Sequence, residues 1–288
     1  MPAKPVVAAT DGSDASLRAV EWAAREAVLR GAPLRIVSAT AEPPRMTGGH
    51  DVSGYDTVGD ILTQNRDRAL SAGADRAAKT APGLLIDADQ LTGAPAEAVT
   101  ASGSGALMLV VGSRGMGEFA AMVLGSVSRY AATHASCPVV VVRETAEAER
   151  RQVGIGIADP QTSAPALEFA FEEAALRKAG LVAVHAWHMP DADVSRAGNE
   201  FTASGRDRIQ AAATARLEEL LGDWRAKYPD VTVSHEVVHG HAGRALAGLS
   251  GRADLVVLGR HHAHHGPASV LQAVLSHAYG PIATVPSA

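Results

Sequence analysis

The clearest potential for chemistry in this chain lies in one glycine-rich segment, Gly112–Ser126. It follows an apolar run and opens a helix-like one, so backbone amides, the positive end of a helix dipole and a serine hydroxyl can face one anion. The segment contains neither a Gly-Lys-Ser/Thr sequence nor a G-x-G-x-x-G turn. This chemistry suits a polyphosphate, but without a loop lysine or an obvious general base it provides poorly for fast phosphoryl transfer.

Strands and helices alternate around this segment. Apolar runs predict strands at 6–10, 34–39, 84–91, 107–111 and 138–142. Between them, helical spacing predicts helices at 16–30, 61–80, 96–102 and 126–135. This alternation predicts the α/β class: a doubly wound, mainly parallel five-stranded sheet with helices on both faces. Ligands of that class bind at the carboxyl ends of strands where the strand order reverses, and the glycine-rich segment follows a strand end.

The pattern occurs twice along the chain. Glu21-Trp22-Ala23 reappears as Glu168-Phe169-Ala170, a shift of 147 residues (168 − 21). Gly93 and Gly112 recur as Gly240 and Gly259 at the same shift. We therefore expect two tandem domains, 1–146 and 147–288, joined by the charged segment 143–151.

Composition narrows the function classes. The 288 residues carry a net charge of −5 without clustered Lys and Arg, which argues against nucleic-acid binding. Cys137, as the single cysteine, cannot form an internal disulfide, and we expect a core or surface thiol in a reducing compartment. No stretch reaches 18 apolar residues and no signal pattern opens the sequence. The sequence thus predicts a cytoplasmic protein that contacts no membrane.

The spacing G-x2-G-x9-G-S/T, matched at Gly112, Gly115, Gly125 and Ser126, resembles the signature of the ATP-binding universal stress proteins. The turn 11–13 (Asp-Gly-Ser), the segment 93–95 (Gly-Ala-Pro) and the proline that opens the last strand of the repeat resemble further elements of that family. The resemblance covers nearly the whole chain, in two copies.

This resemblance implies a set of roles in the first copy. Asp11 and Gly12 would lie at the nucleoside and metal side of the pocket, and Ala39 and Thr40 would line the adenine. The glycine-rich loop would hold the phosphates of ATP, with Mg²⁺, and Arg114 is a further candidate phosphate contact. The resemblance also implies that the last strands, 138–142 and 281–285, pair within one chain or between chains, as an intrachain pseudo-dimer or a homodimer.

Structural explanations stand beside these roles. A glycine-rich turn can serve tight packing alone, and Asp11 can simply cap its own turn. Arg114 can be solvated. The tryptophans more readily pack than bind, although Trp187, near the second adenine-equivalent position, merits a binding test.

The second copy departs from the signature. His262 and Ala268 replace the second and third glycines, although Ser269 is retained. Asp159-Pro160 takes the place of Asp11-Gly12, one residue closer to the helix landmark. We therefore expect a degenerate nucleotide loop. A histidine cluster takes its place and has transition-metal chemistry, but the lack of a Cys or carboxylate framework favours a solvated loop: His261, His262, His264 and His265, with His239 and His241 on a neighbouring turn.

We expect an ATP-binding stress-response regulator that acts as a nucleotide-dependent sensor or switch with an unidentified protein partner and no catalytic residues. One alternative is a slow ATPase or a nucleotide-dependent transferase of the adenine-nucleotide α-hydrolase-like class. Another is an interaction module that no longer uses nucleotide. A turnover assay with and without Mg²⁺ and a search for co-purified nucleotide discriminate among them.

Overall fold

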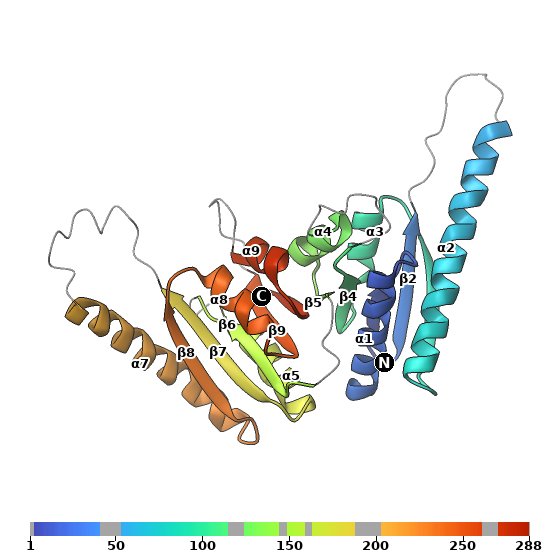
Figure 1. The fold of residues 1–288 in the computed structure, drawn as a ribbon. Helices are drawn as coiled ribbons and strands as arrows, with labels where there is room; N and C mark the ends of the chain where they lie inside the picture. Colours follow the sequence, from blue (N-terminus) through green and yellow to red (C-terminus); the bar gives the residue numbers. More distant parts are fainter. Residues whose placement is uncertain are drawn as a thin grey trace. The chain divides into compact units, whose positions relative to one another are not determined.

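The computed structural model describes residues 3–40, 53–114, 124–143, 149–158, 163–187, 203–260 and 270–287. It divides the chain into two compact units, Met1–Thr145 and Ala146–Ala288. Strands and helices alternate in each unit (Figure 1).

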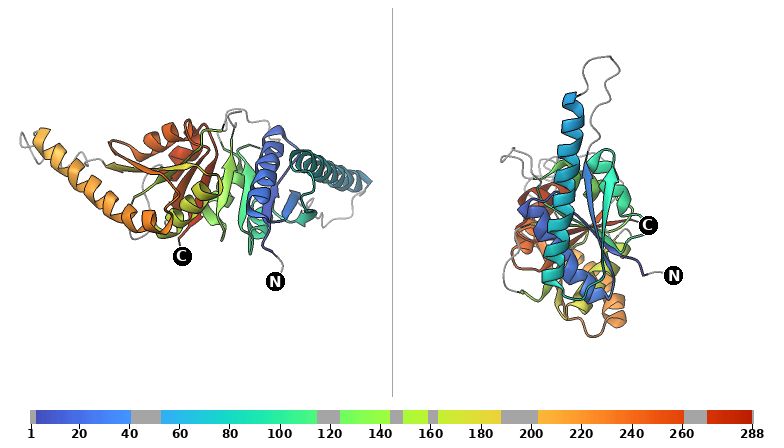
Figure 2. Two further views of the ribbon diagram at one scale, coloured as in Figure 1. Left: turned by 90° about the horizontal axis from the view of Figure 1, so that it is seen from below. Right: turned by 90° about the vertical axis from the view of Figure 1, so that its right-hand side faces the viewer.

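The first unit is a parallel sheet with the strand order β3-β2-β1-β4-β5. Helices α1 and α2 pack against each other, and α3 and α4 form a second packed pair (Figure 2). Its elements are β1 (Val6–Ala9), α1 (Asp14–Arg30), β2 (Leu34–Thr40), α2 (Ser53–Thr80), β3 (Ile86–Thr92), α3 (Pro95–Ser102), β4 (Met108–Gly112), α4 (Ser126–His134) and β5 (Val139–Val142).

The second unit repeats this topology, with parallel strands in the order β8-β7-β6-β9-β10. The predicted fold class, two tandem doubly wound domains with five parallel strands each, is confirmed. The elements of this unit are β6 (Gln152–Gly156), α5 (Ala164–Leu176), β7 (Gly180–Trp187), α7 (Ala203–Lys227), β8 (Val233–His239), α8 (Ala242–Ser250), β9 (Leu255–Arg260), α9 (Val270–His277) and β10 (Ile282–Pro286).

The ends of the first helix follow from its flanking residues. Ser13 has an extended backbone and its side chain accepts a hydrogen bond from the amide of Ser16, which caps α1. Gly31 ends the helix in the left-handed region, at φ 59°. Helix α2 begins at Ser53, before the predicted start at residue 61. Gly54 and Gly59 interrupt the apolar periodicity there, which hid the first turns from the pattern.

The shift of 147 residues holds in the backbone hydrogen bonds of the two units. The amide of Thr10 donates to the carbonyl of Val37 at 2.9 Å, and that of Ile157 donates to Val184 at 2.9 Å. Near the ends of α2 and α7, Ala81 bonds to Ala77, just as Tyr228 bonds to Trp224. Residues of the two units can therefore be compared one to one from β1 to the end of α2.

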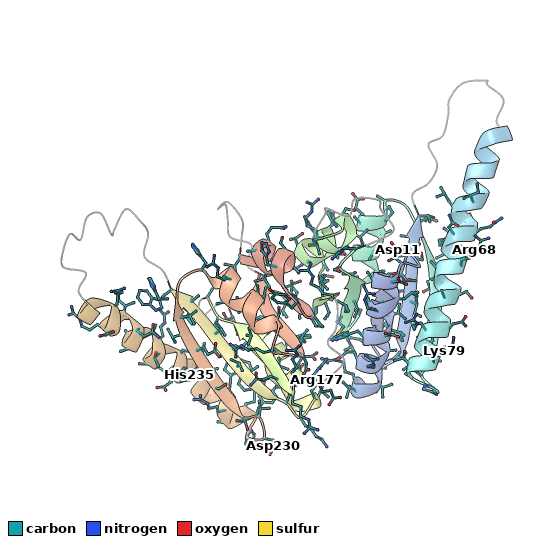
Figure 3. All side chains as sticks on the ribbon, viewed as in Figure 1. Asp11, Arg68, Lys79, Arg177, Asp230 and His235 are labelled. Carbon is teal, nitrogen blue, oxygen red and sulfur yellow. The ribbon has the colours of Figure 1, made fainter. Side chains whose placement is uncertain are left out.

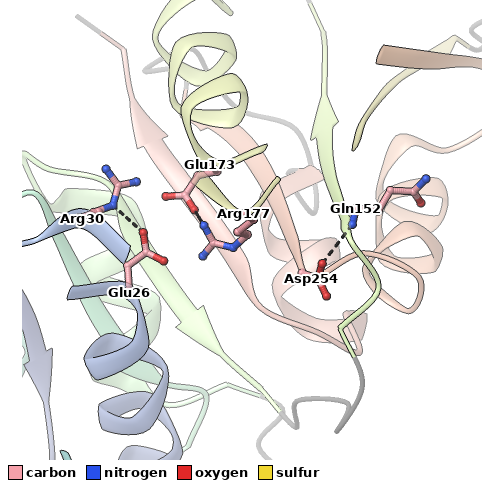
Figure 4. Close-up of polar contacts among 6 residues, drawn as sticks. All are labelled: Glu26, Arg30, Gln152, Glu173, Arg177 and Asp254. Atoms are coloured by element: carbon pink, nitrogen blue, oxygen red, sulfur yellow. Dashed lines mark hydrogen bonds and ion pairs between the residues drawn. The ribbon is translucent and has the colours of Figure 1, made fainter. Parts of the chain in front are cut away.

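An ion pair near the end of the first helix of each unit repeats the same register (Figure 4). In α1 the guanidinium of Arg30 meets the buried carboxylate of Glu26 at 2.6 Å, one turn earlier, and Arg177 meets Glu173 in the same way in α5. In the second unit Asp254 also accepts a hydrogen bond from the amide of Gln152 at 3.1 Å, which ties the start of β6 to β9.

At one strand–helix contact, side-chain volume is distributed differently in the two cores. A Cβ atom built on Gly156 in β6 would lie 2.8 Å from Leu246 of α8. Its counterpart in β1 is Ala9, and the counterpart of Leu246 in α3 is the smaller Val99. A small strand residue thus accompanies a large helix residue, as close packing of an interior requires.

Candidate functional site

The strand order of the first unit reverses between β1 and β4, which lie side by side with Ala8 opposite Val110. The turn after β1 and the segment after β4 therefore leave the sheet next to each other, at its carboxyl edge. Binding sites of doubly wound sheets form at such a reversal. The sequence-predicted residues Asp11, Gly12, Gly112 and Arg114 all lie here.

The turn after β1 is held together by its own side chains. The Oδ1 atom of Asp11 accepts hydrogen bonds from the amide of Ser13 at 3.0 Å and from its hydroxyl at 2.6 Å. Gly12 has φ +84°, and its amide donates to the Thr10 hydroxyl at 3.1 Å. Asp11 thus caps its turn and lies near the start of α1 (Figure 3). Its carboxylate is only half-buried, so capping leaves it within reach of a ligand.

Gly112 and Gly125, two glycines of the signature, differ in whether the packing around them requires a glycine. A Cβ atom on Gly112 would lie 2.8 Å from the backbone of Ala15, so β4 requires a glycine where α1 crosses it. A Cβ atom on Gly125 would meet nothing closer than 3.6 Å, which is ordinary van der Waals contact. The described fold therefore gives no steric reason for glycine at 125.

Helix α4 presents backbone donors at this edge. Its N-cap is Gly125, which has an extended backbone and provides no side-chain cap. The amide of Gly125 donates to the carbonyl of Ser113 at 2.9 Å, so this amide already has an acceptor within the protein. Within the described part of the chain, the next two amides, those of Ser126 and Val127, have no hydrogen-bond acceptor. They are the free donors of a helix N-terminus.

The hydroxyl of Ser128 fixes this helix end against the sheet. It donates to the carbonyl of Gly112 at 2.5 Å, and Ser128 is buried. Ser126, by contrast, is exposed, and so is Arg114 after β4. The helix therefore starts at a set position beside the end of β4, with its first side chain open to solvent.

The end of β2 contributes a polar wall that includes a residue the sequence reasoning missed. Ala39 and Thr40 are half-buried at the last two positions of β2. The guanidinium of Arg66, on α2, donates to the Thr40 hydroxyl at 3.3 Å and to Gln90 at 2.5 Å. The Nε atom of Arg66 is buried without a hydrogen-bond partner in the described structure. The only feature of the sequence that could have indicated Arg66 is its position as a basic residue on the face of α2 that lies toward β2.

The sequence matches the model of the universal stress protein family twice, over residues 2–143 and 149–286. The chain belongs to the universal stress protein family. Universal stress protein Rv2005c of Mycobacterium tuberculosis is 33% identical over 268 residues, which cover 89% of this chain and 86% of that protein. Universal stress protein MT2052 of the same species is 32% identical over 305 residues, covering 96% and 93%.

Solved structures agree on the architecture. A universal stress protein from Archaeoglobus fulgidus superposes with a TM-score of 0.70 at 16% identity, over 99% of this chain and 97% of that one. At that identity the likeness concerns the fold. The family resemblance read from the glycine spacing is thus confirmed, and each unit is a universal stress domain.

Several predicted residues lie outside the described part of the structure. They are Gly115 with the rest of its loop, Asp159-Pro160, His261, His262, His264, His265, Ala268 and Ser269. Among the described residues, no group of three or more His, Cys, Asp or Glu side chains is placed to hold a metal ion. Cys137 is buried, which makes it a core thiol. None of the described helices is long and apolar enough to cross a membrane.

The register of the second universal stress domain identifies the counterpart of Asp11. Because Ile157 is the counterpart of Thr10, the residue at the position of Asp11 is Ala158, which agrees with the one-residue offset of Asp159 seen in the sequence. The second domain therefore has no carboxylate at this position. The counterpart of Thr40 is Trp187, so the polar wall is lost as well.

Proposed function

We propose that the chain is an ATP-binding regulatory protein, in which the first universal stress domain holds the nucleotide and its occupied and empty states select different protein partners. The observation that carries the proposal is the start of α4, where two backbone amides have no acceptor in the described structure and follow a glycine that the described residues do not require for packing. A helix N-terminus of this kind favours a phosphate by its free amides and its dipole.

The glycine at position 125 supports a ligand role because packing does not account for it. Any small side chain fits there without displacing the protein, whereas a phosphate on the amides of Ser126 and Val127 needs the space in front of them. Within the described fold, the space in front of these amides is open to a ligand. The exposed guanidinium of Arg114 stands on the same edge and supplies a complementary charge.

The residues of the β1 turn fit a magnesium nucleotide. Mg²⁺ is usually held by one or two carboxylates together with substrate phosphates and water, rather than by a full set of protein ligands. Asp11 provides one such carboxylate at the reversal point of the sheet, across from the phosphate donors. Thr40 and Arg66 provide hydroxyl and guanidinium groups at the end of β2, where the nucleoside would lie.

Binding rather than turnover is favoured by the groups at this edge. Phosphoryl transfer needs a positioned base or water-orienting group and a cation on the transferred phosphate. Asp11, the carboxylate of the β1 turn, has its Oδ1 committed to Ser13, as a capping residue has. We therefore propose a sensor, with hydrolysis slow or absent.

The test removes one backbone donor from the start of α4. Ser126→Pro deletes the amide at the first helical position, where proline is well tolerated, and Gly125 already has the extended backbone that precedes a proline (φ −66°, ψ 155°). We expect ATP affinity in calorimetric titration to fall roughly tenfold or more, as for the loss of one charge-assisted hydrogen bond.

The matched control is Ser126→Ala, which removes the hydroxyl and keeps the amide. It should bind ATP more tightly than Ser126→Pro, and both variants should melt as the wild type does. Equal ATP affinity in the wild type and Ser126→Pro would remove the α4 amides from the site. Phosphate release, measured with and without Mg²⁺, separates the sensor from the ATPase: multiple turnovers per minute would favour the enzyme.

A further inference from the structure

The second universal stress domain has a cavity of about 330 Å³ at the carboxyl edge of its sheet. It lies between α7 and the ends of β6 and β7, which are the counterparts of α2, β1 and β2. The cavity thus occupies the position at which the first domain has Asp11, Thr40 and Arg66. Its volume is at the small end of the range of ligand pockets.

The wall of this cavity has exchanged polar groups for apolar ones. Thr10, Asp11, Thr40 and Arg66 of the first domain correspond to Ile157, Ala158, Trp187 and Ala213. The exchange is concerted, because it includes both strand ends and the facing helix. A space of this size with an apolar wall gains free energy by taking apolar surface out of water, and it offers little to a triphosphate.

The indole of Trp187 is held in place before any ligand arrives. Its Nε1 atom donates to the amide oxygen of Gln210 at 2.7 Å, and the Gln210 amide in turn donates to the carbonyl of Val237 at 2.6 Å. The ring of His239 lies with its centroid 4.6 Å from that of the indole. A fixed aromatic wall lowers the entropy cost of binding a flat ring.

A second ring of the wall is also anchored. The Nδ1 atom of His185 lies 2.9 Å from the carbonyl oxygen of Ile157, and since a carbonyl only accepts, Nδ1 carries the proton. The imidazole therefore stands as a rigid side of the cavity. Together with Trp187 it gives the cavity two anchored ring walls.

Among the described residues that line the cavity, the one permanently charged group is Arg216 of α7. Its counterpart in the first domain is Ala69, which packs beneath the Gly12 turn. No described residue forms an ion pair with the Arg216 guanidinium, which is exposed to solvent. A guanidinium at the rim of an apolar cavity matches a carboxylate on an apolar body.

We infer that the second domain binds a small planar aromatic monocarboxylate in this cavity, with the ring against Trp187 and the carboxylate at Arg216. The site is independent of the nucleotide site of the first domain. It gives the chain two ligand classes, one at each copy of the same sheet edge.

The test titrates the full-length chain with 2-naphthoate in a calorimeter. We expect saturable binding of one molecule per chain, with a Kd of roughly 1 mM or tighter for a ligand of this size. Ala213→Phe fills the cavity and should weaken binding at least tenfold. The matched control Ala211→Phe places the same ring on an exposed position of α7 and should leave binding unchanged.

A second pair of measurements tests the charge. Arg216→Gln should weaken 2-naphthoate binding about fivefold or more, while the binding of the uncharged 2-naphthylmethanol stays as in the wild type. The comparison of the two probes in Arg216→Gln does not depend on filling the cavity, so it remains a valid test even if Ala213→Phe lowers the melting temperature. Gly125→Glu, in the first domain, should leave both probes unaffected.

Four outcomes would overturn the inference: no saturation by 2-naphthoate, unchanged affinity in Ala213→Phe, equal losses for both probes in Arg216→Gln, or displacement of 2-naphthoate by ATP. The last would show that the cavity is a nucleotide site. These outcomes leave the proposal for the first domain untouched, because that proposal is read from ATP and from Ser126→Pro.

Discussion

The two universal stress domains share a backbone register and differ in chemistry at one edge of the sheet. The amides of Thr10 and Ile157 donate to equivalent carbonyls at the same distance, yet the next residue is Asp11 in one domain and Ala158 in the other. The cavity at this edge in the second domain is lined mainly by apolar groups. A repeated fold thus preserves the position of this sheet edge, and it does not preserve the chemistry of the side chains there.

The largest effect on this contrast is expected from a carboxylate introduced at the start of α4. Gly125→Glu places a side chain and a negative charge in front of the amides of Ser126 and Val127, and we expect calorimetric ATP binding to be lost. Ala101→Glu adds the same charge to an exposed position of α3 and should keep wild-type affinity. If Gly125→Glu bound ATP as the wild type does, the phosphates would have to lie elsewhere.

The number of nucleotides per chain is the next test. We expect one tight ATP per chain, with any second event at least a hundredfold weaker, because the second domain loses the Asp11 carboxylate and the Arg66 guanidinium at this edge. The loss of the Asp11 contact with Mg²⁺ and of a charge-assisted hydrogen bond from Arg66 together contributes about 3 kcal/mol or more, which is a factor of at least one hundred. Titration of the intact chain to two equivalent tight sites would contradict the asymmetry.

The two signature glycines of the first domain should respond differently to one methyl group. Gly112→Ala drives a Cβ atom into the backbone of Ala15 and should lower the free energy of unfolding by about 1–3 kcal/mol. The methyl group of Gly125→Ala has space, so the free energy of unfolding should stay within about 0.5 kcal/mol of the wild type while the affinity for ATP falls. Chemical denaturation measures both, and equal destabilisation would refute the division of roles.

The smallest expected effect belongs to the β1 turn. Asp11→Ala removes the acceptor of the Ser13 amide and hydroxyl and the one carboxylate of that turn. We expect ATP affinity in the presence of Mg²⁺ to fall about tenfold, with a smaller change in its absence, because part of the effect passes through the metal. An equal loss with and without Mg²⁺ would assign Asp11 to the turn alone.

Most of the architecture was predictable because the signals are local and repeated. The strands β1, β4 and β5 of the first sheet are short apolar runs, and the shift of 147 residues marks the duplication in the amino-acid sequence itself. The predicted start of α2 was wrong, since Gly54 and Gly59 interrupt the helical spacing of apolar residues there. The one-residue offset of Asp159 from the position of Asp11 was visible in the sequence, and the backbone hydrogen bond of Ile157 agrees with it.

The site was predictable in place and less so in detail. The glycine spacing located the α4 end, but which amides are free depends on a hydrogen bond from Gly125 to Ser113 that no pattern shows. Arg66 was missed because its contact with Thr40 joins residues 26 apart in sequence. The cavity beside Trp187 likewise depends on side chains from three elements, which only the folded register brings together.

The exchange of volume between β6 and α8 constrains how these two domains can change. With Leu246 in place, restoring at Gly156 the alanine that β1 carries would force a buried collision, and shortening Leu246 alone would leave a void. Either single step costs stability, and a Cβ at position 156 would also lie 3.0 Å from Leu258 of β9. At this contact the alanine of the first domain cannot be transferred to the second by itself, because the residues that pack on it from α8 and β9 would have to change with it.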